Sequence, residues 1–234
     1  MEHKRLTLFA GHYGSGKTNI AVNYALHLAR EGKRVCIADL DIVNPYFRTK
    51  DSAKELAEAG VDLISPQFAN SNVDLPALPA EAYRLVTDKN TYGIMDIGGD
   101  DRGAYALGRY VPAILEENNY RMAYVANCYR PLTRTAEDAL EVMREIEAAC
   151  GLAFTCIINI SILGSETTPE TVLESFDFIR QLSTLSGLPI FLHTAKIDIA
   201  STLEGKLDPV LPLQLQEKYF DLPSQKPLNR PLWG

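Results

Sequence analysis

The chain has 234 residues, of which 46% are hydrophobic and 23% charged, a balance that is typical of globular proteins and excludes disordered and fibrous classes. With 23 basic and 30 acidic residues, its formal net charge is −7. We therefore expect neither nucleic acid nor a membrane as a partner, because an anionic polymer or surface would repel the chain on average.

Short β-rich segments alternate with longer helical segments, the pattern of parallel βαβ units. Strands are predicted over residues 6–10, 34–39, 61–64, 92–97, 122–127, 154–158 and 189–192, and several of them are continuous apolar runs. Helices are predicted over residues 18–31, 51–59, 79–87, 104–117, 135–149, 168–185 and 203–219. The sequence thus predicts a three-layer α/β fold, in which helices flank a mainly parallel, twisted sheet of about seven strands.

No linker, repeat or low-complexity segment interrupts the alternation, so residues 1–221 are predicted to form a single domain. Residues 222–234 contain three prolines and are predicted to form an extended tail. The first residues lead directly into an apolar strand without the features of a signal peptide, and no apolar run reaches the ~18–20 residues of a membrane span. The four cysteines form no C-x-x-C pair. We expect a cytoplasmic protein.

A phosphate-binding loop follows the first predicted strand. The segment fits G-x-x-x-x-G-K-[ST], between a strand and a helix, and its residues are Gly11, His12, Tyr13, Gly14, Ser15, Gly16, Lys17 and Thr18. Glycines let backbone N–H groups turn towards a phosphate, and the helix N-terminus adds its dipole. Lys17 is predicted to reach the β- and γ-phosphates and to act in catalysis, and the Thr18 hydroxyl to ligate Mg²⁺.

Acidic residues end two of the predicted strands. The second strand ends in Asp39 and is followed by Asp41, and the fourth ends with Asp96 and is followed by Gly99. Ligands of open α/β sheets bind at the carboxyl ends of the strands. We expect Asp96 to hold Mg²⁺, Asp39 to lie in the outer shell of the metal, and Asp41 to orient the attacking water. A backbone N–H near Gly99 is placed to sense the γ-phosphate.

The phosphate loop, the Asp-x-Asp strand end and the Asp-x-x-Gly strand end together resemble the MinD/ParA/CobQ-type (SIMIBI class) P-loop NTPases over residues 6–200. The resemblance implies a mainly parallel sheet flanked by helices, binding of ATP and Mg²⁺, slow hydrolysis and a nucleotide sandwich dimer. Carried over by position, the phosphate, metal and water-positioning residues are Lys17, Thr18, Asp39, Asp41 and Asp96.

The chain departs from this family pattern at one position. MinD-like members read G-K-G-G-x-G-K-[ST], and the first lysine crosses the dimer interface; here His12 and Tyr13 stand at the second and third positions. The homodimer is therefore an open alternative and not an expectation. Arg48 is a candidate replacement charge, a solvated loop arginine being the alternative. Arg102, Arg130 and Arg134 are candidates for receiving an anionic second substrate or a partner's carboxylates, surface ion pairs being the alternative.

Adenine is the expected base. The strand that carries N-K-x-D in related GTPases continues here as Asn159-Ile160-Ser161-Ile162, without the lysine and the guanine-binding aspartate. Asn159 is expected to hydrogen-bond the base edge, its alternative being a strand-end turn residue. Lys196-x-Asp198, near the end of the next predicted strand, leaves guanine open as the alternative base.

The sequence therefore predicts an ATP- and Mg²⁺-binding protein, a slow ATPase that acts as a nucleotide-dependent switch or assembly factor on an unknown protein partner. The first alternative is an ATP-dependent small-molecule kinase or ligase, resembling dethiobiotin synthetase or cobyrinate amidase, with a second small-molecule substrate. The second alternative is a nucleotide-binding module that does not hydrolyse its ligand.

Overall fold

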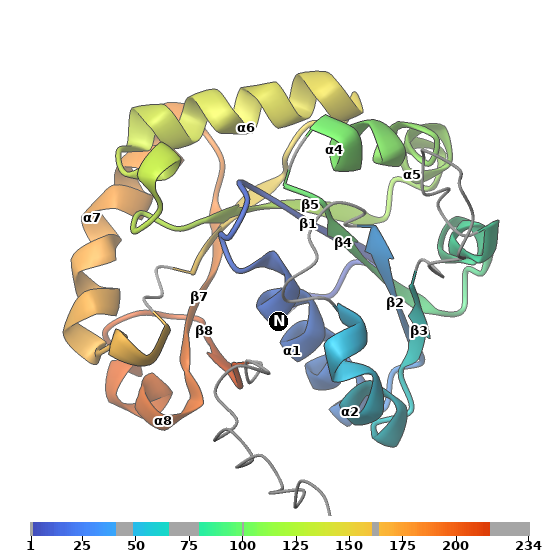
Figure 1. Cartoon of the computed structure of the whole chain (residues 1–234), viewed down its shortest axis with the longest axis horizontal. Coiled ribbons are helices and arrows are strands. Elements are labelled where there is room, and N and C mark those ends of the chain that lie inside the picture. The colour runs from blue at the N-terminus through green and yellow to red at the C-terminus, as the bar shows by residue number, and fades with distance from the viewer. Residues whose placement is uncertain (1, 41–48, 66–79, 100, 161–163, 216–234) are drawn as a thin grey trace, which may run out of the picture.

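A single eight-stranded sheet forms the centre of the fold (Figure 1). The computed structural model describes residues 2–40, 49–65, 80–99, 101–160 and 164–215. All neighbouring strands pair in parallel, in the order β3-β2-β4-β1-β5-β6-β7-β8. Their bounds are β1 Leu6–Ala10, β2 Val35–Leu40, β3 Asp62–Ile64, β4 Tyr92–Ile97, β5 Tyr120–Ala126, β6 Cys156–Asn159, β7 Ile190–Lys196 and β8 Val210–Leu213.

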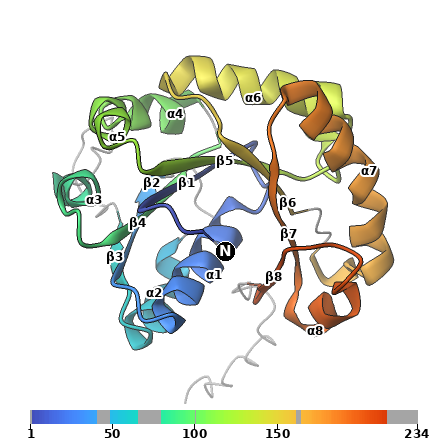
Figure 2. The same ribbon diagram turned by 180° about the vertical axis from the view of Figure 1, so that it is seen from behind.

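Helices cover both faces of the sheet, as the two opposite views show (Figures 1 and 2). The α-helices are α1 Lys17–Arg30, α2 Ala53–Glu58, α3 Arg84–Thr87, α4 Asp101–Gly108, α5 Val111–Glu117, α6 Ala136–Cys150, α7 Pro169–Ser186 and α8 Ile197–Ala200. Short 3₁₀ helices span Thr49–Ser52, Ala80–Tyr83, Pro131–Thr133, Gly164–Glu166 and Ser201–Leu203. Helices α1 and α2 lie on one face, and α4, α5 and α6 lie on the other. Within the described ranges, no helix combines the length and apolarity needed to cross a bilayer.

Two apolar clusters hold the three layers together. In β1, Leu6 and Leu8 face the cluster beneath α4–α7, whereas Phe9 faces the cluster beneath α1 and α2. All five residues of β1 and all six of β2 are buried, because side chains on either face meet a helix layer. This double burial explains why the strands appear as apolar runs without polar alternation.

The predicted three-layer α/β fold is confirmed, and all seven predicted strands are present. Strands 6–10 and 92–97 match the structure residue for residue. The helix predicted over 104–117 is instead two helices, since Pro112, with no backbone N–H, lies in the first turn of α5. The single domain over residues 1–221 stays a prediction, and the tail over 222–234 lies outside the described residues.

The helix predicted over residues 203–219 is wrong. Residues 201–203 form a 3₁₀ turn, Val210–Leu213 form the edge strand β8, and residues 216–219 lie outside the described part of the chain. Leu211 and Leu213 are buried while Pro212 is exposed, the two-residue period of a strand. Proline is accepted in β8 because an edge strand has one side without a ladder partner.

A buried ion pair joins the start of β1 to the end of α5. The Arg5 guanidinium donates to both carboxylate oxygens of Glu117 and to the backbone carbonyls of Leu85 and Thr91, at 2.8 and 3.0 Å. The Arg5 and Glu117 side chains are only 7% and 11% exposed. Although burial alone would raise the pKa of Glu117, hydrogen bonds from Arg5 and Lys89 hold it below its usual value. The pair therefore anchors β1, which leads directly into the phosphate loop.

We expect Glu117→Gln to lower the free energy of unfolding by about 3 kcal/mol at neutral pH, because it leaves the Arg5 charge buried without its carboxylate. A carboxyl group whose pKa is lower in the folded state stabilises the fold above its unfolded pKa, and this contribution is lost as the pH falls through the folded pKa. The difference in unfolding free energy between the wild type and Glu117→Gln should therefore be smaller at about pH 3 than at neutral pH. Denaturant unfolding at the two pH values measures it.

Glu116→Gln is the matched control, since Glu116 is the exposed neighbour of Glu117 on the same helix. It should change the unfolding free energy by less than about 0.5 kcal/mol. A Glu117→Gln loss that is equally large at both pH values would show that the charge of Glu117 is not what stabilises the fold.

Candidate functional site

The predicted phosphate loop connects β1 to α1 at the carboxyl edge of the sheet. Gly16 precedes the helix with φ 100°, a left-handed conformation, and a Cβ there would lie 2.6 Å from Cδ1 of Ile160. Gly11 is held as tightly, since a Cβ would lie 2.5 Å from the carbonyl oxygen of Val125. Both glycines are thus required by the packing of the loop against neighbouring strands.

The amino end of α1 differs from those of the two other long helices. Thr135 caps the start of α6 and Thr168 caps the start of α7, each in a capping box in which the threonine hydroxyl accepts from the backbone N–H three residues on. At α1 the capping residue is Gly16, with no side-chain cap, and the first turn holds no acidic residue. The first turn of α1 therefore supplies neither a side-chain cap nor a carboxylate of its own to the N-terminal N–H groups and the positive end of the dipole. An anion such as a phosphate fits this end of the helix.

Thr18 and Asp96 meet directly behind the loop. The Thr18 hydroxyl donates to Oδ2 of Asp96 at 2.7 Å, and Thr18 and Asp96 are 8% and 0% exposed. The hydroxyl of Thr49, which begins the 3₁₀ helix Thr49–Ser52, also donates to Oδ2 of Asp96, at 3.1 Å. Two hydroxyls and a carboxylate, all oxygen ligands of the kind that Mg²⁺ prefers, thus converge on one point.

Asp39 lies beside Asp96 on the neighbouring strand. The two residues are register partners in the β2–β4 pair, and paired residues of parallel strands point to the same face, here the face covered by α1. Asp39 is 2% exposed and Asp96 is fully buried. Two buried carboxylates side by side are costly without a cation, so their placement fits a cation-binding edge.

Gly99 brings the loop after β4 into contact with the phosphate loop. A Cβ at Gly99 would lie 2.6 Å from the backbone nitrogen of Tyr13 and 2.9 Å from Nζ of Lys17. Lys17 is 5% exposed, and its ammonium group donates to the carbonyl oxygen of His12 at 3.1 Å. The amine is therefore held inside the loop, where it would meet a bound phosphate.

The rim of the loop carries its more exposed residues. Tyr13 is 52% exposed, and the partly exposed His12 contacts the Tyr13 carbonyl oxygen through Nδ1 at 2.9 Å. Ser15, in contrast, is buried, and its hydroxyl has no hydrogen-bond partner among the described residues. A Cβ at Gly14 would lie 3.9 Å from Nε of Arg130. The loop after β5 thus brings a guanidinium group to the phosphate loop.

Asn159 ends β6 with its side chain buried. Its Nδ2 group lies 2.8 Å from Oγ of Ser175 on α7 and 3.3 Å from Nδ1 of His193 on β7. Burial lowers the pKa of His193, so its ring is neutral at neutral pH. These contacts tie α7 to the sheet. The predicted contact of Asn159 with a nucleotide base stays a prediction.

The structure brings together most of the predicted site residues. The phosphate loop, Asp39 and Asp96 share one edge of the sheet, whereas Asp41 and Arg48 lie outside the described residues, and only the backbone of Arg102 is described. Sequence reasoning missed Thr49, although its position after an acidic strand end was a usable signal. It also singled out Arg130 without placing it at the phosphate loop.

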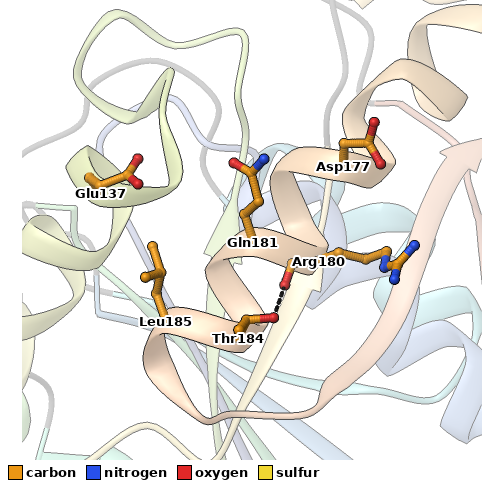
Figure 3. Close-up of a pocket in the computed structure, with 6 residues that line it drawn as sticks. All are labelled: Glu137, Asp177, Arg180, Gln181, Thr184 and Leu185. Atoms are coloured by element: carbon orange, nitrogen blue, oxygen red, sulfur yellow. Dashed lines mark hydrogen bonds between the residues drawn. The ribbon is translucent and has the colours of Figure 1, made fainter.

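Magnesium and a nucleotide phosphate fit the residues present. The convergent oxygens of Thr18, Thr49 and Asp96 are a suitable donor set for Mg²⁺, and a side chain at Gly99 would collide with Tyr13 and Lys17 of the phosphate loop. A shallow hollow between α6 and α7 is separate from this site (Figure 3). It contains none of the predicted site residues, and its lining is Glu137, Asp177, Arg180, Gln181, Thr184 and Leu185.

Comparisons with known proteins identify the fold. No family model matches the chain, and no curated protein matches its sequence. Three solved structures are similar: FtsY of Thermotoga maritima (TM-score 0.54, 18% identity), FtsY of Mycoplasma mycoides (0.51, 17%) and the signal recognition particle receptor FtsY of Elizabethkingia anophelis (0.52, 16%). Each match covers 81% of this chain, but only 60%, 60% and 58% of the FtsY chains. The likeness confirms the predicted α/β fold with a parallel sheet flanked by helices, and membership of the MinD/ParA/CobQ-type (SIMIBI class) P-loop NTPases stays a prediction.

Proposed function

We propose that this chain binds ATP with Mg²⁺ at its phosphate loop and hydrolyses it slowly, as a nucleotide-dependent switch or assembly factor. The observation that carries the proposal is the 2.7 Å contact between the Thr18 hydroxyl and the buried Asp96 carboxylate, at the amino end of a helix that has no side-chain cap. One partner comes from the phosphate loop and the other from the acidic strand end. Their meeting supports a joint site for phosphate and metal.

The roles follow from charge and position. The N–H groups at the start of α1 and the Lys17 ammonium would bind the β- and γ-phosphates. Thr18 and Asp96 would hold Mg²⁺, with Asp39 in its outer shell, and the metal would neutralise phosphate charge. The buried edge of the sheet keeps these groups positioned before the nucleotide arrives, so little reorganisation opposes binding. Asp41 is proposed to orient the attacking water.

Arg130 supplies a second positive charge at the loop. Its Nε is buried and has no hydrogen-bond partner among the residues that the structure describes, and it lies beside the open backbone of Gly14. A buried guanidinium N–H without an acceptor is costly, whereas a phosphate oxygen would satisfy it. We propose that Arg130 contacts the phosphates, on the side of the loop opposite to Gly99.

The kinase or ligase is the second candidate, and it is favoured by the rim of the loop. A histidine stands where MinD-like members carry the interface lysine, and the exposed ring of Tyr13 beside it offers an apolar contact. Such a rim would suit a small second substrate that receives the phosphoryl group. In this case the nucleotide would not need a second copy of the chain.

Lys17→Ala should weaken ATP binding at least about 30-fold, because it removes a buried cation that faces the phosphates. Isothermal titration calorimetry with ATP and Mg²⁺ measures the loss. Lys54→Ala, which removes an amine that is 90% exposed on α2, is the control and should bind ATP like wild type. Wild-type protein that binds GTP about tenfold more tightly than ATP would refute adenine, and wild-type protein that binds neither would refute the proposal.

Arg130→Ala should weaken ATP binding roughly tenfold, the value of a hydrogen bond to a charged group, without lowering the melting temperature of the nucleotide-free protein. Arg144→Ala is the control, since it removes an exposed arginine on α6 that is not among the predicted site residues. Calorimetry and thermal unfolding provide the two readouts. Equal affinities of the two variants would remove Arg130 from the site.

Analytical ultracentrifugation with and without a non-hydrolysable ATP analogue separates the two candidates. A switch should form a dimer only with the analogue, because the nucleotide would complete the interface. The kinase or ligase should keep the same mass in both conditions. A mass that does not change with the analogue would therefore exclude a dimerising switch.

A further inference from the structure

Three ligand-type side chains converge at the far end of α1, away from the phosphate loop. Nε2 of His3 lies 3.0 Å from one carboxylate oxygen of Glu31, and Nε2 of His27 lies 3.2 Å from the other. The three groups offer ligand atoms that all lie within 4.8 Å of one another. The N-terminal segment and the end of α1 are thus joined by two imidazoles and one carboxylate, and both views show the N-terminus beside α1 (Figures 1 and 2).

The spacing of these residues follows from the helix. His27 and Glu31 are four residues apart at the carboxyl end of α1, so they lie on the same face, one turn apart. The carboxyl end of a helix carries the negative end of its dipole, which favours a cation. His3 approaches from outside the helix and completes a triangle. The helix spacing thus brings His27 and Glu31 together, and the N-terminal segment adds His3 to them.

A fourth residue holds His3 in its orientation. The second ring nitrogen of His3, Nδ1, lies 3.0 Å from the hydroxyl of Tyr24. Tyr24 is fully buried and its ring packs against Phe9 and Phe191, with centroid distances of 5.6 and 6.4 Å. Because the Tyr24 hydroxyl occupies Nδ1, Nε2 is turned towards Glu31. Histidines that bind metals use the same arrangement, in which one nitrogen ligates and the other is hydrogen-bonded.

The three ligand groups lie close enough for one zinc ion to draw them together. Bonds of about 2.0–2.1 Å from Zn²⁺ to nitrogen and oxygen place neighbouring ligands roughly 3.3 Å apart. Nε2 of His3 and Nε2 of His27 lie 3.0 and 3.2 Å from different oxygens of Glu31, and one ligand atom from each of the three residues lies within 4.8 Å of the others, so small side-chain rotations would close the site around one ion. An ion pair alone needs one cation for Glu31, and a second protonated imidazole 5.9 Å from the first would repel it. A divalent cation uses both imidazoles and the carboxylate at once.

We propose that His3, His27 and Glu31 form a Zn²⁺ site, in which Nε2 of each histidine and the Glu31 carboxylate are ligands and water takes the fourth position. Nothing in the proposal depends on nucleotide binding, since His27 lies ten residues beyond Lys17, about 15 Å along the helix. Bound zinc would fasten the N-terminal segment to α1 and so stabilise the fold by mass action.

Zinc titration of the full chain without a histidine tag tests the proposal. We expect one zinc ion per chain by calorimetry, a higher melting temperature with zinc, and a visible spectrum of tetrahedral type when Co²⁺ replaces zinc. His27→Gln should weaken zinc binding at least about 100-fold, and Tyr24→Phe, which removes only the hydroxyl that orients His3, about tenfold. Glu31→Gln provides a second ligand variant, and circular dichroism checks that each variant is folded.

Glu58→Gln is the matched control, because Glu58 also forms an i,i+4 pair near the end of a helix, with Lys54. It should bind zinc like wild type. Binding that His27→Gln and Glu31→Gln leave unchanged would overturn the proposal, as would an octahedral cobalt spectrum. Sulfur-to-cobalt charge-transfer bands would do the same, because they would assign the metal to a cysteine such as the half-buried Cys128.

Discussion

The parallel direction of all eight strands is the constraint on which the site depends. When every strand runs the same way, every carboxyl end lies at one edge of the sheet, so residues far apart in sequence become neighbours there. Asp39 and Asp96 become register partners although 56 residues separate them. Thr18, in the first helix, donates its hydroxyl hydrogen bond to the Asp96 carboxylate. One antiparallel strand at β2 or β4 would carry its acidic residue to the opposite edge.

Much of the fold could be predicted because a parallel sheet buries both faces of its strands. The apolar runs of β1 and β4 therefore predicted the bounds of both strands. The phosphate loop was recognisable because a predicted strand precedes it and a predicted helix follows it. Local pattern could not predict β8, because Val210–Leu213 contains a proline and is defined only by pairing with β7. Pro112 was a sequence signal for the break between α4 and α5, but the apolar periodicity that continues through residues 104–117 predicted one helix.

The site was predictable where its chemistry is local or follows from the carboxyl ends of parallel strands. Glycines and Lys17 follow each other in one loop, so their joint role is visible in the sequence. Thr49 and Arg130 belong to the site through tertiary packing: one reaches Asp96 and the other lies beside Gly14. The direction of a side chain at a strand end also depends on which distant elements pack against it. Asn159 points towards α7, and its amide group contacts Ser175, which no spacing in the sequence reveals.

The missing side-chain cap of α1 would couple the local stability of this helix to the proposed nucleotide binding. In α6 and α7 the chain closes the first turn with its own threonine, so their local stability is independent of solutes. In α1 that task is left to water or to a phosphate. If the proposed nucleotide binds there, amide hydrogen exchange in the first turn of α1 would depend on its concentration, whereas exchange at the starts of α6 and α7 would not. A bound phosphate would then act as the cap that α1 does not carry itself.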